Sequence, residues 1–329
     1  MKLYKKILLI TVVSLLAIGS AGGIFIASMT SFNGPTKQND VSLKTWMNSI
    51  KDETKLNDII MPGSHDAGTN GMSWLSETQH LDIKDQLNLG TRYFDLRVNK
   101  HNDDYVIYHS IINGAKFDPI FEDIKEFIVN NPSETLLLDF QHFKNDSDEY
   151  VFHKVKNELK GYLINNDTNK TDLKFIDELI LKDARGKCVV FFGDNSKYVD
   201  ESFIFTRNND RCTNLNSALD SCYEKDRHTI SSEDFINSSL PYYIEKIESK
   251  IKKEEAKGIF VLQGQLTDGM FVFGPYHRER GHAKNMSKYL NVLPSQKYFH
   301  HINVIMRDFL DENKTSEIIK FNKYKNITK

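Results

Sequence analysis

Two short motifs early in the chain hold side chains that could do chemistry. His65 and Asp66 lie in the run MPGSHDAGT, and Asp95 and Arg97 lie in the run LGTRYFDLRV. An imidazole has an unperturbed pKa of about 6.5, so a histidine can give or take a proton at neutral pH. A guanidinium is a planar fork that matches two oxygens of a phosphate or carboxylate. The two motifs therefore predict acid–base chemistry on an anionic substrate.

A histidine and an aspartate further along the chain complete the candidate set. His109 lies in the run YHS, and Asp308 lies in the run MRDF near the C-terminus. Each candidate has a structural explanation when it is taken singly. A lone histidine after a strand is usually a hydrogen-bonded structural residue, Asp95 and Arg97 could form a buried ion pair, and Asp308 could cap a helix. Charges inside apolar segments are costly unless they are paired or functional, so their joint occurrence favours an active site.

The elements that position these residues alternate along the chain. Short apolar runs rich in Val, Ile and Phe predict strands that are covered on both faces. These runs are Asp58–Met61, Arg92–Val98, Tyr105–Tyr108, Thr135–Phe140, Cys188–Phe192, Ile259–Leu262 and Asn303–Met306. Runs with a helical period predict helices. They are Phe117–Asn130, Asp148–Leu163, Leu173–Leu181, Glu233–Lys253 and Ser316–Tyr324.

This alternation predicts an α/β protein with a parallel sheet in a single domain. Seven strands fit an irregular or incomplete (β/α) barrel of the TIM type, and a doubly wound open sheet is the alternative. Asp95 and Arg97 are two residues apart on one strand, so both should face the barrel interior. The candidates fall near the C-terminal ends of strands, where barrel enzymes place their catalytic residues.

Composition excludes several classes of protein. The chain of 329 residues has 43 basic and 45 acidic side chains, a net charge of -2. No overall field therefore attracts nucleic acid, and a substrate anion must be held by a few placed cations. The mean hydropathy of -0.47 argues against a protein with several membrane spans. We expect a monomer.

The N-terminus predicts export. Three lysines within residues 2–6 precede an uncharged, mostly apolar run from Ile7 to Met29. This pattern is typical of a signal peptide or an N-terminal membrane anchor in residues 1–30. Residues 31–41 then form a polar linker, and residues 42–329 form the folded domain. We expect a protein that is secreted or anchored to the outer face of the cell membrane.

The three cysteines are compatible with export. Cys212 and Cys222 lie close together in a polar segment and could form a disulfide. Cys188 lies in an apolar strand-like run and is expected to be a buried thiol. The cysteine and histidine spacing does not match a zinc site.

Taken together, the motifs resemble the X domain of the phosphatidylinositol-specific phospholipases C, above all the bacterial single-domain branch. The resemblance covers about residues 42–312 and rests on PGSHDAGT, LGTRYFDLRV, His109 and the late strand that ends in RDF. The run Leu266-Thr267-Asp268-Gly269 resembles a further family segment. The resemblance implies a phosphodiesterase, formally a phosphorus–oxygen lyase. Such an enzyme cleaves phosphatidylinositol, or a similar lipid at a membrane surface, to diacylglycerol and inositol 1,2-cyclic phosphate.

The resemblance also implies a role for each residue. His65 would be the general base that takes the proton from the inositol 2-hydroxyl. His109 would be the general acid that protonates the leaving diacylglycerol oxygen. Arg97 would hold the phosphate oxygens, Asp308 would orient His65, and Asp95 would support His109.

Asp66 and Arg97 bear on the cofactor. Asp66 matches a family position near the phosphate, so both residues are expected to bind substrate. Eukaryotic relatives carry a carboxylate where this chain has Arg97, and they bind calcium there. A guanidinium repels a cation and supplies the positive charge itself, so we expect catalysis with no metal and no cofactor. Asp66, Asp95 and Glu134 are the carboxylates from which a calcium site could otherwise be built.

Two other functions remain open on the sequence. A related barrel phosphodiesterase acting on glycerophosphodiesters or sphingolipids would need a divalent ion held by carboxylates near a histidine. A lipid- or surface-binding module without activity would use the same residues only structurally. Head-group specificity is also open, and its candidate residues are Lys187, Asp194, Gln263, Gln265 and Tyr276.

Overall fold

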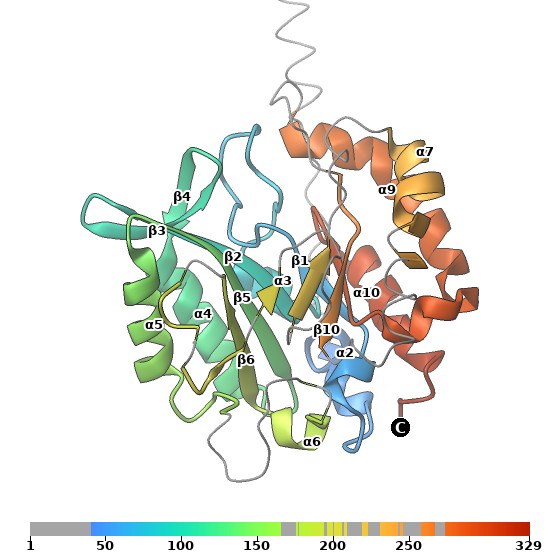
Figure 1. Ribbon diagram of the computed structural model, residues 1–329, viewed down its shortest axis with the longest axis horizontal. Coiled ribbons are helices and arrows are strands. Elements are labelled where there is room, and N and C mark those ends of the chain that lie inside the picture. Colours follow the sequence, from blue (N-terminus) through green and yellow to red (C-terminus); the bar gives the residue numbers. More distant parts are fainter. Residues whose placement is uncertain are drawn as a thin grey trace, which may run out of the picture. The chain divides into compact units, whose positions relative to one another are not determined.

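Parallel strands curl into one sheet at the centre of the molecule, with helices around it (Figure 1). The computed structural model describes residues 41–165, 176, 178–193, 196–199, 201–205, 207–208, 219–222, 231–242, 244–245, 258–266 and 274–329. The strands are β1 Met61–Ser64, β2 Tyr93–His101, β3 Asp104–His109, β4 Ile112–Lys116, β5 Thr135–Lys144, β6 Lys187–Phe192, β7 Ile204–Phe205, β8 Arg207–Asn208, β9 Leu219–Cys222, β10 Ile259–Gln263 and β11 Val304–Arg307.

The helices lie between these strands. The α-helices are α2 Val41–Lys44, α3 Ile83–Asn88, α4 Phe117–Asn130, α5 Ser147–Glu158, α6 Leu181–Ala184, α7 Ser232–Asp234, α9 Gly274–Val292 and α10 Glu312–Lys320. Short 3-10 helices are η1 Trp46–Ser49, η2 Leu56–Asp58, η4 Leu293–Ser295, η5 Lys297–His301 and η6 Phe321–Lys323, and η3 Phe235–Ser239 is a π-helix. No helix of the described ranges is both long and apolar enough to cross a membrane.

The strand order makes the sheet a barrel. It runs β7-β6-β5-β2-β1-β11-β10-β9-β8, and all neighbours on this path are parallel. The two ends of the path, β7 and β8, are separated in the chain only by residue 206. Since consecutive Cα atoms are about 3.8 Å apart, the sheet must curl back on itself. The predicted irregular TIM-type barrel is therefore confirmed, and the open sheet is excluded.

Side chains alternate between the barrel interior and the helical layer. Along β2, Tyr93 packs in the interior cluster with Met61 and Val304, whereas Phe94 and Leu96 pack outward against α4. A second outer cluster joins β10 and β11 to α9 and α10. Since side chains alternate between the two faces of a strand, Asp95 and Arg97 lie on the same face as Tyr93, the barrel interior, as predicted.

Two of the expected strands differ from the prediction. The strand expected at Asp58–Met61 lies later, at Met61–Ser64, because η2 occupies the start of the predicted range. Gly63 permits this pairing, since a Cβ there would come 2.5 Å from Val304 Cγ1. The strand expected at Tyr105–Tyr108 is confirmed as β3, but it is antiparallel to β2 and pairs with β4, which the sequence did not predict.

The helix predictions were right where the apolar period was strong. The range of α4 is the predicted one, while α5 and α10 overlap their predicted ranges. The helix expected at Leu173–Leu181 is wrong in its described part, because Ile180 makes a β-bridge and α6 begins only at Leu181. The helix expected at Glu233–Lys253 begins as α7 and η3, and residues 246–253 lie outside the described residues.

Several sequence expectations fall on segments that the structure does not describe. These are the export segment and most of the linker, Cys212 with its expected disulfide, Asp194, and residues 267–269. Cys188 is described, and it is a fully buried free thiol as predicted.

Candidate active site

β1 and β11 bring His65 and Asp308 together at one end of the barrel. The two strands pair with Ser64 opposite Arg307, so the residues that follow them are neighbours. His65 Nδ1 lies 2.7 Å from Asp308 Oδ1, and both side chains are buried. Burial alone would lower the pKa of His65, but the Asp66 and Asp308 carboxylates outweigh it and raise this pKa above its ordinary value. The predicted pairing of Asp308 with His65 is confirmed.

A buried glutamine joins the two strand ends. Gln79 Nε2 donates to the carbonyls of His65 at 3.0 Å and of Arg307 at 2.9 Å, and Gln79 Oε1 accepts from Leu310 N at 3.0 Å. The sequence analysis missed Gln79, because an amide in a polar loop carries no periodic or motif signal. Its three hydrogen bonds fix the position of His65 relative to the bend after β11.

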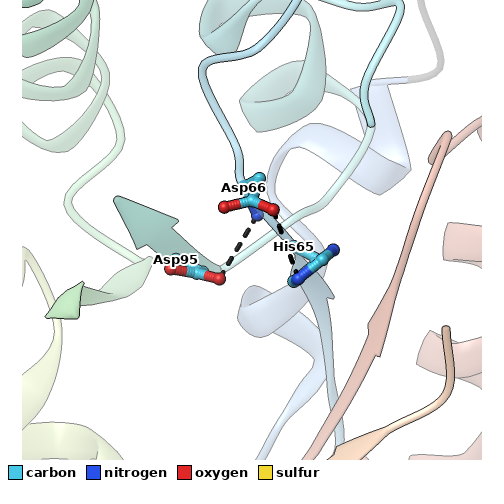
Figure 2. Close-up of side chains that lie close together, drawn as sticks. All are labelled: His65, Asp66 and Asp95. Atoms are coloured by element: carbon cyan, nitrogen blue, oxygen red, sulfur yellow. Dashed lines mark hydrogen bonds and ion pairs between the residues drawn. The ribbon is translucent and has the colours of Figure 1, made fainter. Parts of the chain in front are cut away.

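Asp66 lies at the centre of the charged groups. Its Oδ2 is 3.3 Å from His65 Nε2 and 3.6 Å from His109 Nε2, and its Oδ1 is 2.7 Å from Arg97 Nε. Burial would raise the pKa of Asp66, but Arg97 and the two histidines hold it well below its usual range. Figure 2 shows Asp66 between His65 and Asp95. One ionised carboxylate therefore couples both imidazoles to the guanidinium.

Asp95 binds Arg97 and the backbone of Asp66. Arg97 Nη2 lies 3.1 Å from Asp95 Oδ2, and the same oxygen accepts from Asp66 N at 3.3 Å. The two carboxylates more than offset the burial of Arg97 and raise its pKa, so this guanidinium is always charged. The Arg97 side chain is 18% exposed, whereas both carboxylates are fully buried. Arg97 therefore presents the positive charge of the site at its surface.

His109 is held in a different way from the one predicted. Its Nδ1 lies 2.8 Å from the carbonyl of Ser76. Since a carbonyl only accepts, Nδ1 carries a proton and Nε2 faces Asp66. The expectation that Asp95 supports His109 is wrong, because Asp95 is directed at Arg97 and Asp66 instead. The antiparallel strand β3 returns the chain from the far end of β2 to the barrel mouth, which places His109 there.

Among the residues that the structure describes, one group has the geometry to hold a cation. The ligand atoms of His65, Asp66 and Asp95 lie within 4.8 Å of one another. Arg97 already forms ion pairs with both of these carboxylates, so its guanidinium supplies the charge that a cation would bring. Glu134, the third carboxylate of the conceivable calcium site, is elsewhere. It precedes β5 and forms a buried pair with Arg92, with 2.8 Å from Arg92 Nη2 to Glu134 Oε2.

The candidates for head-group specificity separate in the structure. Lys187 is the first residue of β6, so it lies at the end of the barrel away from the site. Gln263 and Gln265 lie at the C-terminal end of β10 and are buried. The Tyr276 ring lies edge-on to Phe309, 5.2 Å between centroids, next to Asp308. These last three residues remain candidates at the mouth.

A further charged group lies inside the barrel and was missed by the sequence analysis. Arg207 Nε donates to Asp139 Oδ1 at 2.6 Å, and Tyr93 Oη donates to Asp139 Oδ2 at 2.5 Å. All three side chains are buried. Arg207 could not have been found from pattern, because it belongs to a two-residue strand.

Known proteins share both the motifs and the fold. Residues 52–192 match the family model described as phosphatidylinositol-specific phospholipase C, X domain. This part of the chain belongs to that family. The match to the X domain contains His65, Asp66, Asp95, Arg97 and His109, and Asp308 lies beyond it.

Two curated relatives and one solved structure are also similar to this chain. A 1-phosphatidylinositol phosphodiesterase of Listeria monocytogenes is 32% identical over 180 residues, 52% of this chain and 55% of the relative. One of Staphylococcus aureus is 26% identical over 172 residues, 49% of this chain and 54% of the relative. The chain thus spans about half the length of these relatives. The structure of a phosphatidylinositol-specific phospholipase C from Listeria monocytogenes has a TM-score of 0.66 at 24% identity and covers 85% of this chain and 98% of its own, so it shares the fold.

Proposed function

We propose that this protein is a metal-independent phosphodiesterase that cleaves phosphatidylinositol to diacylglycerol and inositol 1,2-cyclic phosphate. The observation that carries the proposal is the convergence of two imidazoles on one point. His65 Nε2 and His109 Nε2 lie 3.3 and 3.6 Å from the same oxygen of Asp66, with Arg97 2.7 Å from the other oxygen. A base, an acid and a fixed cation at one place are the parts that intramolecular phosphoryl transfer needs.

The base half of the reaction belongs to His65. Asp308 accepts a hydrogen bond from Nδ1, which leaves the lone pair of Nε2 for the substrate. Nε2 takes the proton of the inositol 2-hydroxyl, and the freed oxygen attacks the neighbouring phosphorus. A new oxygen–phosphorus bond closes the ring while the bond from phosphorus to the glycerol oxygen breaks.

The acid half belongs to His109. With Nδ1 bound to the Ser76 carbonyl, the transferable proton of the imidazolium is on Nε2. Nε2 gives this proton to the leaving glycerol oxygen, which completes diacylglycerol. Asp66 stabilises the charged form of His65 and lies 3.6 Å from His109 Nε2, and Arg97 neutralises the charge on the phosphate oxygens. Because Arg97 is part of the chain, no metal ion is required in this mechanism.

Two exposed apolar side chains support action at a membrane surface. Trp74 is 37% exposed and Ile111 is 89% exposed. They lie two residues from Ser76 and His109 respectively, so the Ser76–His109 hydrogen bond brings their loops together at the barrel mouth. Large apolar side chains in such a place favour contact with lipid. In line with this, we propose that residues 1–30 export the protein, which then acts outside the cell as a monomer through the barrel of residues 42–329.

A substrate panel tests the proposal. The protein is assayed on vesicles of phosphatidylinositol, phosphatidylcholine or sphingomyelin, on a soluble short-chain phosphatidylinositol, and on glycerophosphocholine. Each assay is run in EDTA and, in parallel, with a divalent ion in place of EDTA. We expect cyclic inositol phosphate from phosphatidylinositol alone, at a higher rate from vesicles than from the soluble lipid. Activity on glycerophosphodiesters or sphingomyelin that appears only with a divalent ion would favour the related metal-dependent phosphodiesterase. A complete lack of hydrolysis would favour a binding module.

A further inference from the structure

The bend that carries Asp308 has a strained backbone. Phe309, directly after Asp308, has a φ of 48°, in the left-handed region that a bulky residue rarely adopts. Such a conformation persists only where surrounding groups hold it, and it clusters at functional sites. The groups that hold this bend therefore also set the position of Asp308 and, through it, of His65.

Lys314 holds both peptide groups that flank Phe309. Its ammonium group donates to the carbonyl of Asp308 at 2.9 Å and to the carbonyl of Phe309 at 2.9 Å. The third contact is to Glu279 Oε1 at 2.5 Å. Since an ammonium group has three donors, all of them are in use. Two of the three fix the strained residue from either side.

Glu279 and Arg307 in turn fix Lys314. Glu279 lies on α9, and the oxygen that binds Lys314 also accepts from Arg307 Nη2 at 2.9 Å. Burial would raise the pKa of Glu279, but Lys314 and Arg307 hold it below its usual value, so this buried carboxylate is charged. One oxygen atom thus connects α9, α10 and the end of β11 directly behind Asp308.

The place of Lys314 in its helix runs against helix preference. Lys314 is the third residue of α10, and its backbone N–H donates to Asp311, the N-cap residue. The helix dipole disfavours a cation in the first turn. A residue type that is unfavourable at its position usually makes a compensating contact elsewhere. Lys314 compensates through its hydrogen bonds to the carbonyls of Asp308 and Phe309.

We propose that Lys314 is a positioning residue for Asp308, and that it keeps His65 in the orientation and tautomer of a general base. This inference rests on the proposed function, in which His65 is that base. Lys314 itself does not bind the substrate in this proposal, because its ammonium group is hydrogen-bonded to Glu279 and the two carbonyls. Its effect passes through the hydrogen bond from His65 Nδ1 to Asp308.

The test compares K314M with K320M and K314R. Lys320 is an exposed residue at the other end of α10, so K320M is the matched control. We expect K314M to lower kcat by about 10- to 100-fold with little change in KM, because a small misplacement of a catalytic group has such effects. The acidic limb of its pH profile should move to lower pH, since Asp308 raises the pKa of His65. K314R, which keeps the charge and donors, should restore part of kcat, and K320M should match wild type.

Two measurements separate positioning from general stability. In the D308N background, K314M should change kcat by less than about twofold, because residues that act through one group are not additive. The imidazole nitrogen resonances of His65, followed by NMR, should shift in K314M and not in K320M. This readout needs no substrate, so it tests the inference even if the panel above shows no hydrolysis. If K314M does not fold, K314Q is measured in the same way. An unchanged His65 spectrum, or a loss that multiplies that of D308N, would overturn the inference.

Discussion

Asp66 contacts its neighbours from a left-handed backbone position. Its φ is 44°, a conformation that aspartate tolerates better than most residues. The Thr78 hydroxyl lies 3.2 Å from its carbonyl, and the Asp95 carboxylate accepts from its N–H. The backbone turn therefore directs the side chain of Asp66 at the two histidines. Two consecutive residues thus supply an imidazole and the carboxylate that balances its charge.

The first prediction concerns D308N. The base must be neutral to act, so kcat/KM should fall as the pH drops through the raised pKa of His65. Asp308 contributes to that increase. In D308N the lowering of the pKa by burial is less opposed, so the pKa of His65 falls and the acidic limb of the profile moves to lower pH. The maximal rate should fall by about 10²–10⁴-fold, because the tautomer is no longer fixed.

The pH profile of kcat/KM checks this prediction, with D103N as the control. Asp103 is exposed in the turn between β2 and β3 and lies outside the site. An acidic limb that stays in place or moves to higher pH in D308N would contradict the assignment of His65 as the base.

Residue-level prediction succeeded where side-chain type and spacing carry the information. His65, Asp66, Arg97 and Asp308 were expected together, and the structure brings them together. The partner of His109 could not be predicted, because it is the backbone carbonyl of Ser76, and every residue has one. Asp95 was assigned to the wrong neighbour for a related reason: its direction depends on where Asp66 turns.

At the scale of elements, the hairpin of β3 and β4 is the main departure from a regular barrel. The apolar run of β3 predicts a strand but not its direction, and β4 is mostly exposed and has no apolar pattern. α9 was missed because its buried face includes Glu279 and His282 beside Pro275, Met286 and Leu290. The buried positions keep a helical period, but two of them are polar, so the hydrophobic signal is broken.

The second prediction concerns the buried ion pair of Arg92 and Glu134, just before the start of β2 and β5. Arg92 Nε and Nη2 lie 2.9 and 2.8 Å from Glu134 Oε2, and both side chains are fully buried. R92M leaves the buried Glu134 charge without its cationic partner, so the free energy of unfolding should fall by about 3–5 kcal/mol. Replacing both residues with methionine should recover much of that loss.

Urea unfolding followed by circular dichroism measures these differences. K84M is the control, because it breaks an exposed, solvent-screened ion pair with Glu126 and should leave the free energy of unfolding nearly unchanged. An R92M variant as stable as K84M would show that the buried pair contributes nothing to stability.

At the scale of the whole molecule, the buried Arg92–Glu134 pair and the candidate catalytic residues lie at opposite ends of the barrel strands. Arg92 and Glu134 precede their strands, whereas His65 and Asp308 follow theirs. Stabilising contacts at one end and reactive groups at the other are the usual arrangement of a TIM-type barrel. The alternation of strands and helices predicted this architecture, but the two-residue strands β7 and β8 at the ends of the path are too short to have a sequence signal.

The most direct test of the account compares histidine variants on phosphatidylinositol vesicles in EDTA, with products followed by phosphorus NMR. Wild type and H101A, which alters an exposed histidine at the end of β2, should release cyclic inositol phosphate at equal rates. H65A and H109A should each lose about 10²–10⁴-fold in rate, the usual contribution of a positioned acid or base. Undiminished activity in H65A or H109A, or wild-type activity that requires calcium, would contradict the account.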